Sequence, residues 1–357
     1  MNSRRIERRF NIIRTLVAIA ASLGIAIVII LLVSKDPWNA LYNFLVGPVT
    51  SLRRFCNVLE LAIPLTFCGL AVSMIFSAGL SNLAAEGSFY TACATTALAA
   101  ILLDLPPVIH PIVCLLIGTA TGILVMGIPA VLKLKWNANE LVSSLMLNYI
   151  CLYIATYLIR TQVLDSSLGI TGSVSFQTTA SLPNLVAGTR LHLGLVFVII
   201  AIIVCWLTLY RTKLGYSVRM IGHNEHFSRY SGMKVGGTLL VVQLIGGALA
   251  GFGGATEMIG MYTRFQYQGL TQYGFDGMLI AIIARYNPAL VPIAAVFLSY
   301  IRTGADIMNR TSDVPMEIIS VIQAGIIMLI VAKKFLNTFE YKQVVNQSKE
   351  RLEEKEM

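Results

Sequence analysis

The sequence predicts an all-α polytopic membrane protein with about ten transmembrane helices, some of them short or discontinuous. Composition predicts the class, because the 357 residues are 56% hydrophobic and only 13% charged, whereas a soluble domain carries about 25% charged residues. The apolar runs are continuous rather than alternating, which favours helices over a β-barrel. Helices also pair their backbone polar groups internally, as the hydrocarbon core of a bilayer requires.

The expected spans follow one another along the chain. The first, residues 16–33, comes after a basic segment and is too long for a typical signal sequence, so we expect a retained span. An amphipathic segment with Trp38 and Tyr42 follows. The other spans are expected at residues 58–77, 87–103, 108–131, 140–159, 193–210, 239–262, 275–285, 289–302 and 316–332. Residues 275–285 number about 11, where about 20 are needed to cross the bilayer, which predicts a half-helix or a re-entrant segment.

Basic residues indicate the orientation of the chain. The net charge of +9 comes from residues scattered among loop ends rather than interleaved with aromatics, which argues against a nucleic-acid partner. Counting alternate spans from a cytoplasmic N-terminus puts three basic clusters inside: Lys133 with Lys135, loop 211–237, and Lys333 with Lys334. The expected regions are a basic cytoplasmic N-terminus at residues 1–15, a transmembrane domain at 16–335 with a cytoplasmic loop at 210–237, and a charged cytoplasmic tail at 336–357.

Two motifs occur twice in the same order. Residues 79–87 read GLSNLAAEG and align without gaps on residues 269–277, which read GLTQYGFDG. Residues 140–145, ELVSSL, resemble residues 317–322, EIISVI. In the expected topology the two members of each pair lie at opposite faces, which predicts a five-plus-five inverted repeat, an architecture common in transporters. The alternative is chance similarity among helix N-termini, where an acid before an apolar run is common.

Polar side chains inside the apolar runs are candidates for a substrate path. A charge at the bilayer centre costs at least about 2.5–3.5 kcal/mol, so such groups face a cavity or a partner. For Glu86 and Asp276, lining a cavity and structural hydrogen bonding are both open, and neutral amides suit a polar uncharged substrate but also join helices. Glu140 and Glu317 fit helix caps. The path candidates are Asn82, Glu86, Asn148, Gln243, Asp276 and Gln323.

No arrangement typical of an enzyme or of a bound cofactor is present in the sequence. The four histidines fall in loops and span ends without a metal-binding spacing, and most of the six cysteines sit inside apolar runs. The glycine-rich stretch 246–254 lacks the lysine of a phosphate-binding loop, so we expect it to allow close helix packing.

Several phrases together resemble the permease subunits of bacterial ATP-binding-cassette (ABC) importers. The likeness is to the branch that moves nucleosides and simple sugars, within the superfamily of branched-chain amino acid and ribose-type permeases. It runs from about Leu59 to Val331. The phrases are residues 76–87, 139–150, 188–192, 273–277, 304–306 and 321–323.

The resemblance implies that residues 222–232 carry a short coupling helix that docks on an ATPase. The alternative is an ordinary positive-inside anchor, but the length of the loop and its Asn-Glu-His-Phe core favour docking. The residues that it assigns to coupling are Gly222, Asn224, Glu225, Phe227, Arg229 and Tyr230.

The resemblance also implies a function: half of a translocation pathway for nucleosides that works by alternating access. The expected partners are a second, related permease chain, an ABC ATPase that binds ATP, and an extracytoplasmic substrate-binding lipoprotein, around a multi-pass protein of the bacterial cell membrane. The chain itself is then a transport subunit and not an enzyme, and it carries no cofactor. The alternatives are a simple-sugar permease, an ion-coupled secondary transporter with Glu86 and Asp276 as proton sites, and a membrane scaffold without transport.

Overall fold

The computed structural model describes residues 36–165 and 172–312, together with residues 24, 27, 31, 324 and 325. Within these residues the chain forms helices and no strand, with only two isolated β-bridges in the loops, so the all-helical prediction is confirmed. The expected spans 16–33 and 316–332 lie outside the two long described stretches, as do Glu317 and Gln323.

Six described helices are long and apolar enough to cross a membrane. They are α3 (Leu52–Ser77), α5 (Ile109–Trp136), α6 (Glu140–Gln162), α7 (Gly194–Arg211), α10 (Val235–Met261) and α12 (Val291–Thr311). Helix α4 (Ala85–Leu102) and the shorter helix α11 (Tyr273–Ile283) fall where the third and eighth spans were expected. Helix α11 has 11 residues, too few to cross about 30 Å at about 1.5 Å each, as its sequence predicts.

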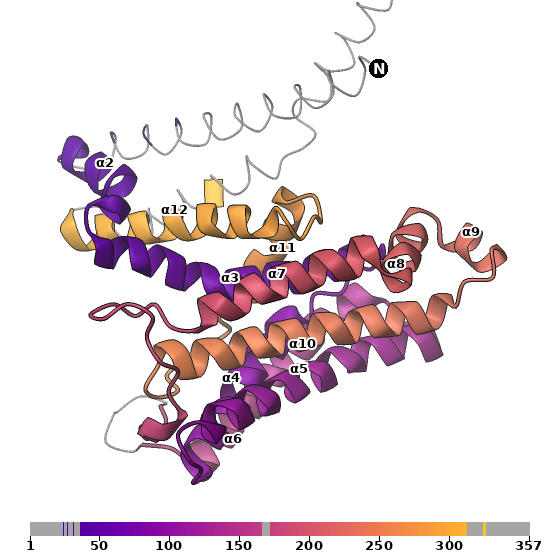
Figure 1. Ribbon diagram of the computed structural model, residues 1–357, viewed down its shortest axis with the longest axis horizontal. Helices are drawn as coiled ribbons and strands as arrows, with labels where there is room; N and C mark the ends of the chain where they lie inside the picture. The colour runs from indigo at the N-terminus through magenta and orange to yellow at the C-terminus, as the bar shows by residue number, and fades with distance from the viewer. Residues whose placement is uncertain are drawn as a thin grey trace, which may run out of the picture. The chain divides into compact units, whose positions relative to one another are not determined.

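The described helices belong to two compact units, one of residues 48–303 and one of residues 1–47 and 304–357. In the larger unit, α3, α5, α7 and α10 run side by side (Figure 1). In the smaller unit, α2 (Pro37–Leu45) is capped by Asp36 and contains the exposed Trp38 and Tyr42 of the predicted amphipathic segment.

Close packing of α5 against α10 depends on glycine. A Cβ added at Gly122 would collide with the Gly247 carbonyl oxygen, and one at Gly251 would lie 2.5 Å from the Gly118 carbonyl oxygen. The two backbones therefore touch over two turns, as small residues allow in membrane helices. This confirms the packing role predicted for residues 246–254.

The predicted end of the ninth span at residue 302 is wrong, because α12 continues to Thr311. Arg302 does not end the helix. Its guanidinium lies 2.5 Å from the Asp276 carboxylate, so its charge is paired within the protein and needs no headgroup or water at that level. The surface pair Arg310 with Asp306 supports the last turns by the i, i+4 spacing.

Candidate functional site

A break in the helices between α3 and α4 is held by three side chains of α6. The break begins at Gly79, whose φ of 76° ends α3. Its backbone N–H groups then donate to α6: Ser81 N to Glu140 Oε2 at 3.3 Å, and Leu83 N to Ser144 Oγ at 3.0 Å. Asn148 completes the row, accepting from the Gly87 N–H at 2.9 Å and donating to the Leu83 carbonyl at 3.1 Å. Positions 140, 144 and 148 share one helix face, so α6 satisfies a backbone that leaves the helical ladder.

Glu86 caps the N-terminus of α11 from a different helix. Its carboxylate accepts hydrogen bonds from the backbone N–H groups of Gln272 and Gly274, both at 2.7 Å, and from the Thr271 hydroxyl at 3.1 Å. Helix α11 has no capping side chain of its own, so this carboxylate supplies the acceptor that its first turn lacks. The side chain is fully buried, and its charge meets the positive end of the α11 dipole.

Helices α4 and α11 begin at the same point and run apart. A Cβ added at Gly274 would collide with the Glu86 backbone, so the two N-termini are in contact. Beyond the end of α11, the Tyr286 carbonyl accepts from Ser77 Oγ at 3.4 Å, next to the break. Near the end of α4, the Ala100 carbonyl accepts from the Gln177 N–H at 3.1 Å, in the segment before α7. Helices α4 and α11 therefore run from one buried junction toward opposite ends of the bundle.

The path candidates in the described residues all bond to protein. Asn82 donates to Gln243 Oε1 at 2.6 Å and accepts from the Ala84 N–H at 2.8 Å. Asn148 and Glu86 hold backbone groups as above, and Asp276 pairs with Arg302. Each of the five is buried, which agrees with the structural alternative left open by the sequence. Their place on a substrate path stays a prediction.

Three side chains of this region were not singled out as site residues from the sequence. Ser144 holds the break, but a serine in an apolar helix is common, and only the folded arrangement shows its partner. Glu60 and Glu257 are buried carboxylates on α3 and α10, each with one oxygen that has no hydrogen-bond partner within the described part of the chain. Charge inside an apolar run was the available signal. Among the described residues, no group of three or more His, Cys, Asp or Glu side chains could hold a metal ion.

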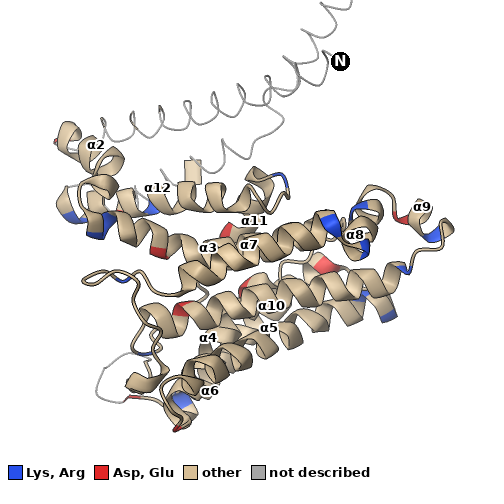
Figure 2. Ribbon diagram, in the orientation of Figure 1, with Lys and Arg blue, Asp and Glu red and all other residues tan. Residues whose placement is uncertain are grey.

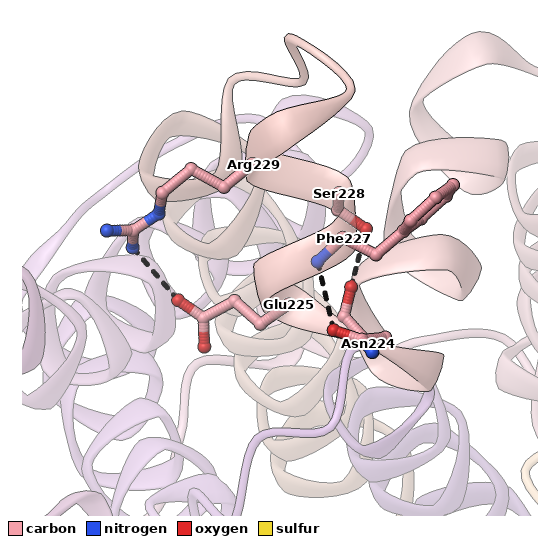
Figure 3. Close-up of polar contacts among 5 residues, drawn as sticks. All are labelled: Asn224, Glu225, Phe227, Ser228 and Arg229. Carbon is pink, nitrogen blue, oxygen red and sulfur yellow. Dashed lines mark hydrogen bonds and ion pairs between the residues drawn. The ribbon is translucent and has the colours of Figure 1, made fainter.

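Two short helices form the loop for which a coupling role was predicted: α8 (Lys213–His223) and α9 (Glu225–Tyr230). Asn224 begins α9, accepting from the Phe227 N–H at 2.9 Å, while its carbonyl accepts from Ser228 Oγ at 2.9 Å (Figure 3). On the exposed side, Arg229 pairs with Glu225 at 3.1 Å. The aromatic side chains of Phe227 and Tyr230 are 56% and 92% exposed, an unusual placement for two large rings on so short a helix.

Gly222 joins this loop to the break after α3. A Cβ at Gly222 would collide with the Ser77 carbonyl oxygen, and a Cβ at Gly79 would lie 3.3 Å from Gly222 Cα. Helix α8 therefore rests backbone to backbone on the end of α3. A displacement of α8 would act directly on the segment that leads to Glu86 and α11.

A cavity of about 780 Å³ lies beside α9. It is polar, and both members of the Arg229–Glu225 pair reach it, as does Glu140 from the start of α6. Basic residues gather at this end of the larger unit, on α8 and α9, in the last turn of α5 and just before α10 (Figure 2). The lining residues are Gly79, Leu80, Ser81, Lys133, Leu134, Asn137, Asn139, Glu140, Leu141, Glu225, Arg229, Val235, Gly236 and Leu239.

His192, just before α7, is expected to make stability depend on pH. Burial lowers the pKa of this imidazole from 6.5 to about 4, and its Nδ1 accepts from the Gly194 N–H at 3.1 Å. Because the folded pKa lies below the unfolded one, the contribution is complete above about pH 6.5 and is lost as the pH falls toward 4. The full loss is on the order of 3 kcal/mol.

Thermal unfolding of the purified protein between pH 7 and pH 5 measures this effect. The variant His192→Gln is expected to show a flatter decline than the wild type, whatever its starting stability. Parallel declines for the two proteins would contradict a buried, neutral His192.

The six long apolar helices among the described residues define a multi-pass membrane protein. The chain belongs to the family of permease components of branched-chain amino acid transport systems, which it matches over residues 54–332. This confirms the predicted family.

Three relatives have similar identity to this chain. It is 30% identical over 342 residues to the guanosine ABC transporter permease protein NupP of Bacillus subtilis, which covers 94% of this chain and 97% of that protein. It is 29% identical over 331 residues to the glucose ABC transporter permease protein TsgB13 of Haloferax volcanii, covering 90% and 87%. It is 27% identical over 329 residues to the nucleoside ABC transporter permease protein NupB of Lactococcus lactis, covering 89% and 90%.

Proposed function

We propose that this chain is the permease subunit of an ABC importer that moves nucleosides. The observation that carries the proposal is the exposed α9 helix, whose neighbour α8 lies backbone to backbone on the end of α3, where the break before α4 begins. Such an arrangement transmits a push from a partner into the membrane domain. Family membership and the names of the relatives support the same function.

The substrate class is tested by uptake. Cells that express the complete importer are expected to take up labelled guanosine faster than cells that lack this chain. Simple sugar is the second candidate, favoured by the similarity to the glucose permease. Labelled glucose uptake in the same pair of strains distinguishes them. Guanosine uptake that does not change when the chain is removed would contradict the proposal.

The partner that acts on α9 would be an ABC ATPase, which binds and hydrolyses ATP for this chain. Replacing Phe227 and Tyr230 by alanine is expected to lower ATP-driven uptake at least about 10-fold, because exposed aromatics often dominate interfaces. Thermal stability is expected to change by less than about 0.5 kcal/mol, since the rings are exposed. Trp38→Ala, at an exposed aromatic of α2, is the matched control. Full uptake by the double variant would remove α9 from the docking surface.

The orientation follows from charge. We expect the end of the larger unit with α8 and α9 to be cytoplasmic because basic residues gather there. A cytoplasmic N-terminus and C-terminus in a bacterial cell belong to the same proposal. About ten spans and a five-plus-five inverted repeat belong to the same proposal. Its support in the described residues is the junction where α4 and α11 meet at their N-termini and run apart, as oppositely oriented repeats do.

A second permease chain would complete the pathway. Helix α6 exposes Tyr149, Tyr153 and Tyr157, which are 56%, 71% and 66% exposed and share one face near the middle of the helix. Phenolic hydroxyls at this depth find no partner in lipid, so a neighbouring chain suits the face better than hydrocarbon does. An extracytoplasmic substrate-binding lipoprotein would deliver the nucleoside to the opposite end from α9.

A further inference from the structure

Glu257 differs from the other buried carboxylates of the bundle. It lies in the last turns of α10 and is 1% exposed. Its Oε1 accepts from the Tyr273 hydroxyl at 3.4 Å, a long hydrogen bond, and its Oε2 has no partner among the residues described. Glu86, by contrast, accepts three hydrogen bonds, and Asp276 faces a guanidinium. Glu257 is therefore a buried carboxylate with an unused acceptor.

An unused acceptor at this depth needs an explanation. Buried polar atoms are almost always hydrogen-bonded, and the exceptions point to strain, water or a ligand. A carboxylate without a countercharge inside a membrane-spanning helix raises the free energy of the folded protein. Such residues mark substrate or ion pathways. Glu60 on α3 shares one of these features, since its Oε1 has no described hydrogen-bond partner. It differs in lying within electrostatic reach of a countercharge, Arg190, as well as of Glu257.

Aromatic rings gather beside the two carboxylates. Tyr262 and Tyr267 belong to the segment between α10 and α11 and lie within electrostatic reach of Glu257. Their ring centroids are 5.3 Å apart, and the Tyr267 ring also lies 5.6 Å from Phe265 and 6.3 Å from Tyr90 of α4. Tyr273, whose hydroxyl reaches Glu257, packs edge-on against Phe89 at 5.2 Å. Flat rings beside a free acceptor are the means by which proteins hold a nitrogen heterocycle.

We propose that Glu257, Tyr273 and the rings of Tyr262 and Tyr267 form a substrate-contact site for the base of a nucleoside. This inference rests on the proposed function. The carboxylate accepts from adjacent N–H groups of the base, such as the ring N–H and amino group of guanine, while the rings contact its faces. The site is closed here, so it binds when the segment between α10 and α11 withdraws from α4.

The test uses the complete importer, with its ATPase and binding protein, in proteoliposomes. Glu257→Gln keeps the shape of the side chain but replaces one acceptor by a donor. It is expected to raise the KM for guanosine at least about 10-fold, since hydrogen bonds to charged groups are strong. The KM for adenosine, which lacks the guanine ring N–H, is expected to change much less. Tyr273→Phe removes one hydroxyl and is expected to give a smaller effect in the same direction.

Each outcome separates the inference from the function on which it rests. Asp306→Asn, in an exposed ion pair of α12, is the matched carboxylate control and should leave both KM values unchanged. If the wild-type importer moves no nucleoside, the proposed function fails. If it moves guanosine and Glu257→Gln keeps the wild-type ratio of guanosine to adenosine KM, the site is wrong. Equal losses for both nucleosides together with lower thermal stability would assign Glu257 a structural role and also overturn the inference.

Discussion

Replacing Glu86 with alanine is expected to abolish transport and to lower the free energy of unfolding by about 3–6 kcal/mol. The variant leaves the N–H groups of Gln272 and Gly274 and the Thr271 hydroxyl without their acceptor, all close to a buried junction. Each unsatisfied buried donor costs about 1–3 kcal/mol. Because α11 is short and has no other capping side chain, its first turn is expected to unwind.

Thermal unfolding in detergent and uptake in vesicles measure the two effects. Glu86→Gln retains one acceptor oxygen but turns an amide N–H₂ toward backbone donors, so it is expected to lose about half as much stability. Glu225→Ala removes an exposed carboxylate and is the control for stability. A Glu86→Ala variant with wild-type unfolding temperature would show that the capping of α11 contributes little to the fold.

The sequence predicts the spans better than the roles of the polar residues within them. Continuous apolar runs locate α3, α5, α6, α7 and α10 because hydrophobicity is a local property of the chain. The predicted end of α12 at residue 302 is wrong because the contact that lets a charged residue lie inside this helix is non-local. In the sequence, Arg302 is a charged residue after an apolar run, which is typical of the end of a span. Only the folded chain brings it to Asp276, which lies 26 positions earlier.

The polar candidates show the same limit. The repeat and the cost of buried charge indicate Glu86 as a candidate, and Asn148 is a candidate as a neutral amide inside an apolar run. Both lie at the junction of α4, α6 and α11. Glu86 accepts from a residue 188 positions away and Asn148 from one 61 positions away, so no local pattern tells a cavity-lining group from one that holds backbone. Glu257 lies outside the repeated motifs, yet it is a carboxylate that retains an unused acceptor. A repeat identifies residues that build the fold as readily as residues that bind substrate.

The buried pair of Asp276 and Arg302 is expected to show strong coupling. Arg302→Met leaves a carboxylate that is 7% exposed without its countercharge, and breaking such a pair costs about 3–5 kcal/mol. Asp276→Asn is expected to cost less, because the Arg302 side chain is 25% exposed and its long stem can carry the charge toward water.

Unfolding of the two single variants and of the double variant Asp276→Asn/Arg302→Met measures the coupling directly. The double variant is expected to be more stable than Arg302→Met alone, because no charge is then left buried. The exposed pair Arg310 with Asp306 on the same helix is the matched comparison, with a coupling of at most about 1 kcal/mol. Additive losses at Asp276 and Arg302 would mean that the two charges are solvated separately, and that α12 is long for a reason other than this ion pair.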